Sequence, residues 1–189
     1  AYLLVTLDAD SQDDLDTMLE QMAELVLDAG AMDVLVADTP AKIKDAWAAR
    51  SSILEAIMQE TKLLDECDVV VPVNKIADYL DFVNKTGEEC GLVIKSFGHA
   101  GDGNLHIYQC SNDLEEEAFK SRVDKFFEII YKEAASCGGL VSGEHGIGSG
   151  KIKYLVDSVG ETNMALMEGI KRVFDPKMIL NPGKVCYRL

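Results

Sequence analysis

The chain has 189 residues, of which 48% are hydrophobic, so we expect about one domain with a sizeable core and not a disordered protein. Acidic residues outnumber basic ones 33 to 18, and the resulting net charge of −15 argues against nucleic acid or an anionic membrane surface as the main partner. Five scattered cysteines without a Cys-x-x-Cys pair, and no signal peptide or transmembrane segment, favour a reduced, cytoplasmic protein.

The first part of the chain alternates predicted strands and helices. The spacing of apolar residues predicts a strand at 2–8, a helix at 11–29, a strand at 33–37 and a helix at 41–58. Thr39 is the expected N-cap of the second helix, with Pro40 as its first residue. That helix carries Trp47 and Arg50.

The remaining elements predict an α+β fold. They are a strand at 68–73, helix 76–90, strands 93–97 and 105–108, a long helix after 113 and a last helix at 161–173. Gly91 is expected to end the first of these helices, and Asp113–Glu116 resembles a capping box before the long one. This order predicts ferredoxin-like units, in which helices cover one face of an antiparallel sheet.

All three histidines of the chain fall in two short segments, 98–106 and 142–146. In the first segment Asp102-Gly103 is the preferred pair for a two-residue hairpin turn. A turn centred there places His99 directly opposite His106, with their Cβ atoms about 5 Å apart. Two imidazoles at that separation can bind one metal ion.

The second segment supplies a carboxylate, Glu144, and the third imidazole, His145. His99, His106 and Glu144 together form a two-histidine, one-carboxylate ligand set with open coordination positions, which suits catalysis better than a closed structural site. His145 is then a candidate acid–base group beside the metal. Zn, Mn and Fe(II) all accept such ligands, so the sequence leaves the metal open.

Three stretches of the sequence carry a family resemblance. The segments at 97–106, 139–148 and 174–184 resemble the C-terminal domain of FAD-linked oxidases of the vanillyl-alcohol oxidase superfamily. More narrowly they are similar to flavin-dependent D-2-hydroxyacid dehydrogenases, the group of D-lactate dehydrogenase, D-2-hydroxyglutarate dehydrogenase and the flavoprotein subunit of glycolate oxidase. The resemblance covers essentially the whole chain.

The resemblance implies roles for individual residues. His99, His106 and Glu144 would hold the divalent metal, which would bind a 2-hydroxy acid. His145 would take the hydroxyl proton while a hydride leaves for the flavin. Arg50 would bind the substrate carboxylate, for which a guanidinium is well shaped. Two residues of the terminal segment would approach the flavin, namely Asn181 and Lys184.

The resemblance also implies a larger protein. Residues 1–189 would form a single substrate- and metal-binding domain, preceded in the whole enzyme by an FAD-binding domain that this chain lacks. We therefore expect that the chain alone does not retain FAD. An electron-transfer flavoprotein, a cytochrome or a quinone would accept the electrons, and the whole enzyme could associate peripherally with a membrane.

Two departures bear on the substrate. Some relatives have asparagine where this chain has Tyr108, and relatives that act on dicarboxylates have lysine where Glu66 stands. Both differences favour a small monocarboxylate such as lactate or glycolate. From the ligand residues alone, a non-haem iron oxygenase, a metal-dependent hydrolase and a non-catalytic metal-stabilised module remain alternatives, although the α+β pattern argues against the barrel expected of the oxygenase.

Overall fold

The computed structural model describes residues 1–186, which fall into two compact units. The first unit is Ala1–Ile53 and the second begins at Leu54. Within residues 1–186 no helix combines the length and the apolar character needed to cross a membrane.

The first unit contains the two predicted helices. Helix α1 (Gln12–Asp28) begins where the Ser11 side chain accepts the backbone N–H of Asp14. Helix α2 (Pro40–Ser51) begins after Thr39, as predicted, because the threonine hydroxyl accepts the N–H of Lys42 and leaves one fewer helix N–H unpaired.

Three predictions for the first sixty residues are wrong. The segments 2–8 and 33–37 are not strands, because within the described residues neither pairs with another strand, and an unpaired strand is not stable. The single helix expected at 41–58 is two, since the backbone leaves helical geometry at Ser52 and α3 (Ile53–Glu60) follows.

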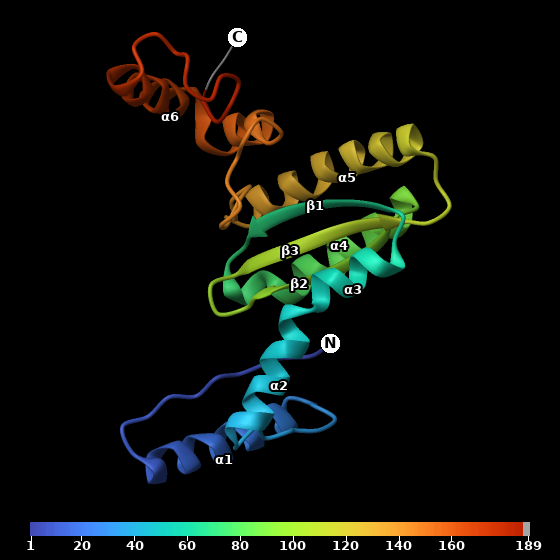
Figure 1. Ribbon diagram of the computed structural model, residues 1–189, viewed down its shortest axis with the longest axis vertical. Coiled ribbons are helices and arrows are strands. Elements are labelled where there is room, and N and C mark those ends of the chain that lie inside the picture. Colours follow the sequence, from blue (N-terminus) through green and yellow to red (C-terminus); the bar gives the residue numbers. More distant parts are fainter. Residues whose placement is uncertain (187–189) are drawn as a thin grey trace. The chain divides into compact units, whose positions relative to one another are not determined.

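The second unit is built on an antiparallel sheet. Strands β1 (Leu63–Val70), β2 (Val93–His99) and β3 (Asn104–Ser111) are arranged in the order β1-β3-β2, as Figure 1 shows. Helix α4 (Ile76–Cys90), preceded by a 3₁₀ turn at Val73–Lys75, connects the two outer strands. Because β3 lies between them, the arrangement is a split β-α-β unit.

Two further helices follow the sheet, α5 (Glu116–Ser136) and α6 (Ile152–Phe174). Between them Leu140 pairs with Val70 at the outer edge of β1, where each residue donates its N–H to the other's carbonyl at 3.1 and 2.8 Å. The order β1-α4-β2-β3-α5, followed by this bridge, is that of a ferredoxin-like unit whose fourth strand is a single bridge. The α+β prediction is confirmed.

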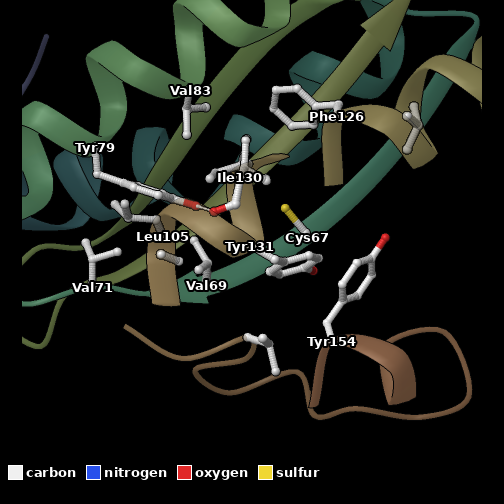
Figure 2. Packing of buried hydrophobic residues seen from close by; sticks show 14 of the residues in the cluster. Cys67, Val69, Val71, Tyr79, Val83, Leu105, Phe126, Ile130, Tyr131 and Tyr154 are labelled. Atoms are coloured by element: carbon white, nitrogen blue, oxygen red, sulfur yellow. Dashed lines mark hydrogen bonds between the residues drawn. The ribbon is translucent and has the colours of Figure 1, made fainter. Parts of the chain in front are cut away.

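The core lies between one face of the sheet and helices α4 and α5. Alternate residues of β1 and β3 point into it, among them Cys67, Val69 and Leu105, and they meet the apolar faces of the two helices (Figure 2). Tyr79 of α4 donates its hydroxyl to the carbonyl of Ile130 in α5 at 2.9 Å, which ties the helices together inside the core. The predicted buried face of α5, comprising Phe119, Val123, Phe126 and Ile130, is confirmed.

Several boundaries differ from those predicted. Strand β1 runs from Leu63 to Val70, so it begins and ends earlier than the predicted strand 68–73. Val71 continues the same register by donating its N–H to the loop residue Gly103. The capping box before α5 does not form; Ser111 accepts the N–H groups of Asp113 and Leu114. Helix α4 ends at Gly91 as predicted. The five cysteines are all free.

Candidate functional site

The histidines occupy the face of the sheet opposite the helices. Cys67 and Ile107 face each other on the core side, so Asp68 and His106, which also pair, point to the other side. Glu66, two residues from Asp68, shares that side. Both faces of the sheet centre are thus covered, since His106 is only 4% exposed and Asp68 is fully buried.

The predicted register of the histidine hairpin is wrong. His99 pairs with Asn104, not with His106, and His106 pairs with Phe97. The loop therefore has four residues, 100–103, and not two. Within it the Asp102 side chain accepts the N–H of Asn104 at 3.2 Å.

A tertiary contact fixes this wider loop. Gly103 has φ of 79°, and its carbonyl accepts the N–H of Val71 at 3.0 Å. A Cβ atom on Gly103 would lie 1.9 Å from the carbonyl oxygen of Val71, so only glycine fits. This hydrogen bond holds the hairpin loop against the end of β1.

The two histidines nevertheless share one face and meet. His106 lies two residues along β3 from the partner of His99, which makes the pair diagonal neighbours. Their ring centroids are 5.7 Å apart, at an interplanar angle of 81°. The prediction that they come together holds, through a diagonal contact instead of a direct one.

Asp68 anchors the loop that carries Glu144 and His145. Its Oδ2 atom accepts the backbone N–H groups of Gly143, Glu144 and His145 at 2.8, 2.8 and 2.9 Å. Three consecutive N–H groups therefore converge on one buried carboxylate oxygen. This arrangement fixes the backbone at the two residues that the sequence singled out.

The other Asp68 oxygen, Oδ1, also accepts hydrogen bonds. Lys151 donates its ammonium to Oδ1, and the Ser142 hydroxyl lies 3.1 and 3.0 Å from the two oxygens. Burial alone would raise the pKa of the Asp68 carboxyl, but Lys151 and the N–H groups of His145 and Glu144 outweigh it and hold that pKa well below its usual range. Asp68 is therefore ionised at neutral pH.

Sequence reasoning did not assign this role to Asp68. The carboxylate and its N–H donors are separated by 75 to 77 residues along the chain. A local clue exists in Gly143, where a Cβ atom would lie 2.3 Å from the Asn104 side-chain oxygen. The glycine lets the loop pass directly over the sheet.

The anchored loop brings Glu144 to the two histidines of the hairpin. Its Oε1 atom lies 2.9 Å from Nε2 of His106 and 3.7 Å from Nε2 of His99. One ligand atom from each of the three residues lies within 4.8 Å of the others, which is compact enough to surround a single ion. The predicted ligand residues are therefore brought together, with His106 buried and the other two exposed.

A second group shares His106. Glu66 Oε1 lies 2.8 Å from Nδ1 of His145 and 3.7 Å from Nδ1 of His106. These three residues also offer ligand atoms within 4.8 Å of one another. In the sequence Glu66 was considered only for its effect on the choice of substrate. It reaches this group because it lies two residues from Asp68, the partner of His106, and alternate residues of a strand share a face.

The buried polar atoms of this second group are incompletely paired. Within the described residues Glu66 Oε1 and His106 Nδ1 are buried and make no hydrogen bond of acceptable geometry, although an imidazole nitrogen lies 2.8 Å from the carboxylate. Burial lowers the pKa of the His106 imidazole, and His145 lowers it further against the raising effect of Glu144. His106 is thus neutral at pH 7, the form in which an imidazole can bind a metal.

The remaining predicted site residues lie elsewhere along the chain. Arg50 is in α2, in the first unit. Asn181 and Lys184 are exposed, and Asn181 has φ of 45°. The terminal segment contacts the loop that precedes α6, where Val185 donates its N–H to the Gly148 carbonyl at 2.8 Å.

The sequence matches the family described as FAD linked oxidases, C-terminal domain, over residues 1–185. The chain belongs to this family, and the recognition made from the three sequence segments is confirmed.

Named relatives agree with this assignment. The chain is 59% identical over 189 residues to a D-lactate dehydrogenase of Anaerostipes hadrus, a match that covers all of this chain and 40% of the relative. It is 39% identical to a D-lactate dehydrogenase of Archaeoglobus fulgidus, over 90% of this chain and 37% of the relative. It is also 34% identical to glycolate oxidase subunit GlcD of Bacillus subtilis, over 88% of this chain and 35% of the relative. The chain spans about two fifths of the length of these relatives.

Proposed function

We propose that this chain is the substrate- and metal-binding domain of an FAD-dependent dehydrogenase that oxidises a small D-2-hydroxy acid to the 2-oxo acid. The observation that carries the proposal is the convergence of His99, His106 and Glu144 within 4.8 Å of one another. The names of the relatives, D-lactate dehydrogenase and glycolate oxidase subunit, support the substrate class.

The residues present fit a divalent metal. Two imidazole nitrogens and one carboxylate oxygen are the donors that Zn, Mn or Fe(II) accepts, and three protein ligands leave positions open for a substrate. His106 enters this group through Nε2. We propose that His99, His106 and Glu144 hold the ion.

Each protein group then has a defined task. When bound, the flavin would accept a hydride from C2 of the substrate and the metal would make its hydroxyl group more acidic. His145 takes the hydroxyl proton at Nε2, the nitrogen that lies 3.9 Å from Glu144 Oε1 and so faces the ligand group. Arg50 binds the substrate carboxylate, and Asn181 and Lys184 contact the flavin.

The charge around the site supports a monocarboxylate. Glu66 places a second carboxylate beside the histidines, with its side chain 27% exposed. It would repel the distal carboxylate of a substrate such as 2-hydroxyglutarate. Phe97 and Tyr108 stack on the same face of the sheet, with centroids 5.2 Å apart, and add apolar surface there.

Metal analysis of the chain tests the ligand assignment. We expect about one divalent ion per chain in the native sequence and in His145→Ala, but none in His99→Ala, because His145 is assigned to proton transfer and not to ligation. Equal metal content in His99→Ala and in the native chain would contradict the proposal. In the whole flavoenzyme, His145→Ala should lower kcat about 10²–10⁴-fold, the usual contribution of a general base.

A further inference from the structure

Two stacked imidazoles lie between two carboxylates at this site. The rings of His106 and His145 have centroids 4.7 Å apart and an interplanar angle of 22°. Both turn Nδ1 toward Glu66, at 3.7 and 2.8 Å, and Nε2 toward Glu144, at 2.9 and 3.9 Å. The two carboxylates therefore occupy opposite ends of the ring pair.

We infer that Glu66 is a positioning residue, which holds the proton of the His145 imidazole at Nδ1 and so leaves the Nε2 lone pair of that ring facing the ligand group. A neutral imidazole has one N–H group and one lone pair, and the partner of one nitrogen decides which is which. A carboxylate accepts hydrogen bonds only, so Glu66, whose Oε1 lies 2.8 Å from Nδ1 of His145, selects the Nδ1–H tautomer of that ring.

This tautomer is the one that the proposed function requires, and the inference rests on that function for its purpose. His106 needs its Nε2 lone pair to bind the metal, and His145 needs its own to accept the substrate proton. A carboxylate on the far side of a ligating histidine also fixes the ring orientation. Glu66 lies beside Nδ1 of His106 as well, but at 3.7 Å it makes no direct hydrogen bond there, so its effect on the tautomer falls on His145.

The contact distances differ between the two rings. The 2.8 Å separation from His145 is within hydrogen-bonding distance, although its geometry is not yet that of a hydrogen bond, whereas the 3.7 Å separation from His106 is too long for one. Hydrogen bonds at catalytic sites often shorten when the ligand binds. Glu66 therefore acts most strongly on His145, and the tautomer of His145 is the first quantity to measure.

The same three residues suggest a competing assignment, a second metal site formed by Glu66, His106 and His145. A metal there would need lone pairs at both Nδ1 atoms, the opposite of the tautomer inferred above. One neutral imidazole cannot direct a lone pair to both groups, so His106 serves only one. The two assignments can be separated by experiment.

The tautomers are read from long-range ¹H–¹⁵N spectra of ¹⁵N-histidine-labelled chain, recorded without metal and with Zn²⁺. The chain has three histidines, so the variants His99→Ala, His106→Ala and His145→Ala assign each signal to its residue. We expect His145 to show the Nδ1–H pattern in the native chain and to lose it in Glu66→Ala. Glu66→Gln, which keeps an acceptor oxygen without the charge, should lie between the two.

Asp65→Asn is the matched control. It removes one negative charge from the neighbouring position of β1, and the asparagine oxygen can still accept the Glu66 N–H as Asp65 does at 2.8 Å. We expect no change in the His145 tautomer. Retained protection of the Glu144 backbone N–H against exchange would show that each variant still folds and anchors its loop.

Kinetics of the holoenzyme give a second readout. We expect Glu66→Ala to lower kcat about 10–100-fold, with a much smaller change in KM for D-lactate, since a residue behind the reacting groups typically contributes that much. An Nε2–H pattern for His145 in the native chain, no response to Glu66→Ala, or two Zn²⁺ ions per chain would overturn the inference. The metal-free spectrum is independent of the metal analysis above, so failure of one does not decide the other.

Discussion

Replacing Asp68 with asparagine tests whether one buried carboxylate holds the loop that carries Glu144 and His145. Asp68 is fully buried and accepts three backbone N–H groups at 2.8–2.9 Å, in addition to the Lys151 ammonium. Asparagine has nearly the same shape but only one acceptor oxygen, and its NH₂ group must face either the N–H groups or Lys151. Either orientation leaves buried groups of like polarity in contact.

The cost can be estimated from these contacts. Hydrogen bonds to a charged group contribute about 1.5–3 kcal/mol each, and removing one partner of a buried ion pair costs about 3–5 kcal/mol. Because the contributions overlap, we expect Asp68→Asn to lower the free energy of unfolding of the second unit by about 3–5 kcal/mol. Lys151→Met should cost less, about 1–3 kcal/mol, since Asp68 keeps its other donors.

Two measurements check this prediction. Urea unfolding should be followed by far-UV circular dichroism, because the one tryptophan, Trp47, lies in the first unit and would report on the wrong part of the chain. Hydrogen exchange should show the N–H groups of 143–145 losing protection in Asp68→Asn and keeping most of it in Lys151→Met. If Asp68→Asn unfolds at the native urea concentration and these N–H groups exchange as before, the anchoring role is refuted.

The pH dependence follows from the same carboxylate. The pKa of Asp68 is lower in the folded chain than in the unfolded chain, where about 3.9 is usual. Its stabilising contribution is therefore present above that pH and is lost as the pH falls below about 4. The free energy of unfolding of the native chain should decline below pH 4 more steeply than that of Asp68→Asn. Parallel declines would mean that other carboxylates dominate acid unfolding.

Three further changes have expected outcomes. Gly103→Ala should destabilise the second unit by about 2–4 kcal/mol, because its Cβ would lie 1.9 Å from the Val71 carbonyl oxygen at a positive φ, whereas Gly101→Ala, with nothing within 4 Å, should be nearly neutral. In the whole enzyme Arg50→Lys should raise KM about 10–100-fold through loss of a two-pronged carboxylate contact, and an unchanged KM would remove Arg50 from the substrate site. Chelation should lower the melting temperature of the native chain but not that of His99→Ala, as differential scanning fluorimetry would show.

Local sequence signals predicted helices α1, α4 and α5 well and the strands of the first unit poorly, and they missed the break at Ser52 and the start of α6 at Ile152. Helix α4 occupies 76–90 as predicted, because its apolar period and the terminal Gly91 act within a few residues. The segments 2–8 and 33–37 have the composition of strands, but pairing depends on a partner that composition does not supply. Strand prediction fails where the partner is absent from the described unit.

The sequence predicts the candidate ligand residues of the site better than it predicts the residues that hold them in place. Histidine, glutamate and glycine in two short segments are unusual enough to indicate a ligand group, whichever loop geometry joins them. Asp68 and Glu66 have no such local signature. Their roles depend on the pairing of β1 with β3 and on the contact of the 142–145 loop with the sheet. Both contacts join residues that are far apart in the sequence.

The hairpin shows why a wrong register still gave the right neighbours. The predicted pairing set His99 opposite His106, and the observed pairing sets it opposite Asn104, a shift of two residues along β3. Side chains alternate with a period of two, so a shift of two keeps both imidazoles on one face, whereas a shift of one would have separated them. Whether the two imidazoles share a face of the sheet therefore depended only on whether the loop has an even number of residues. The observed loop also makes the Val71–Gly103 hydrogen bond, which joins it to the residue that follows β1. A turn rule considers only the residues of the hairpin itself, so it does not include this contact.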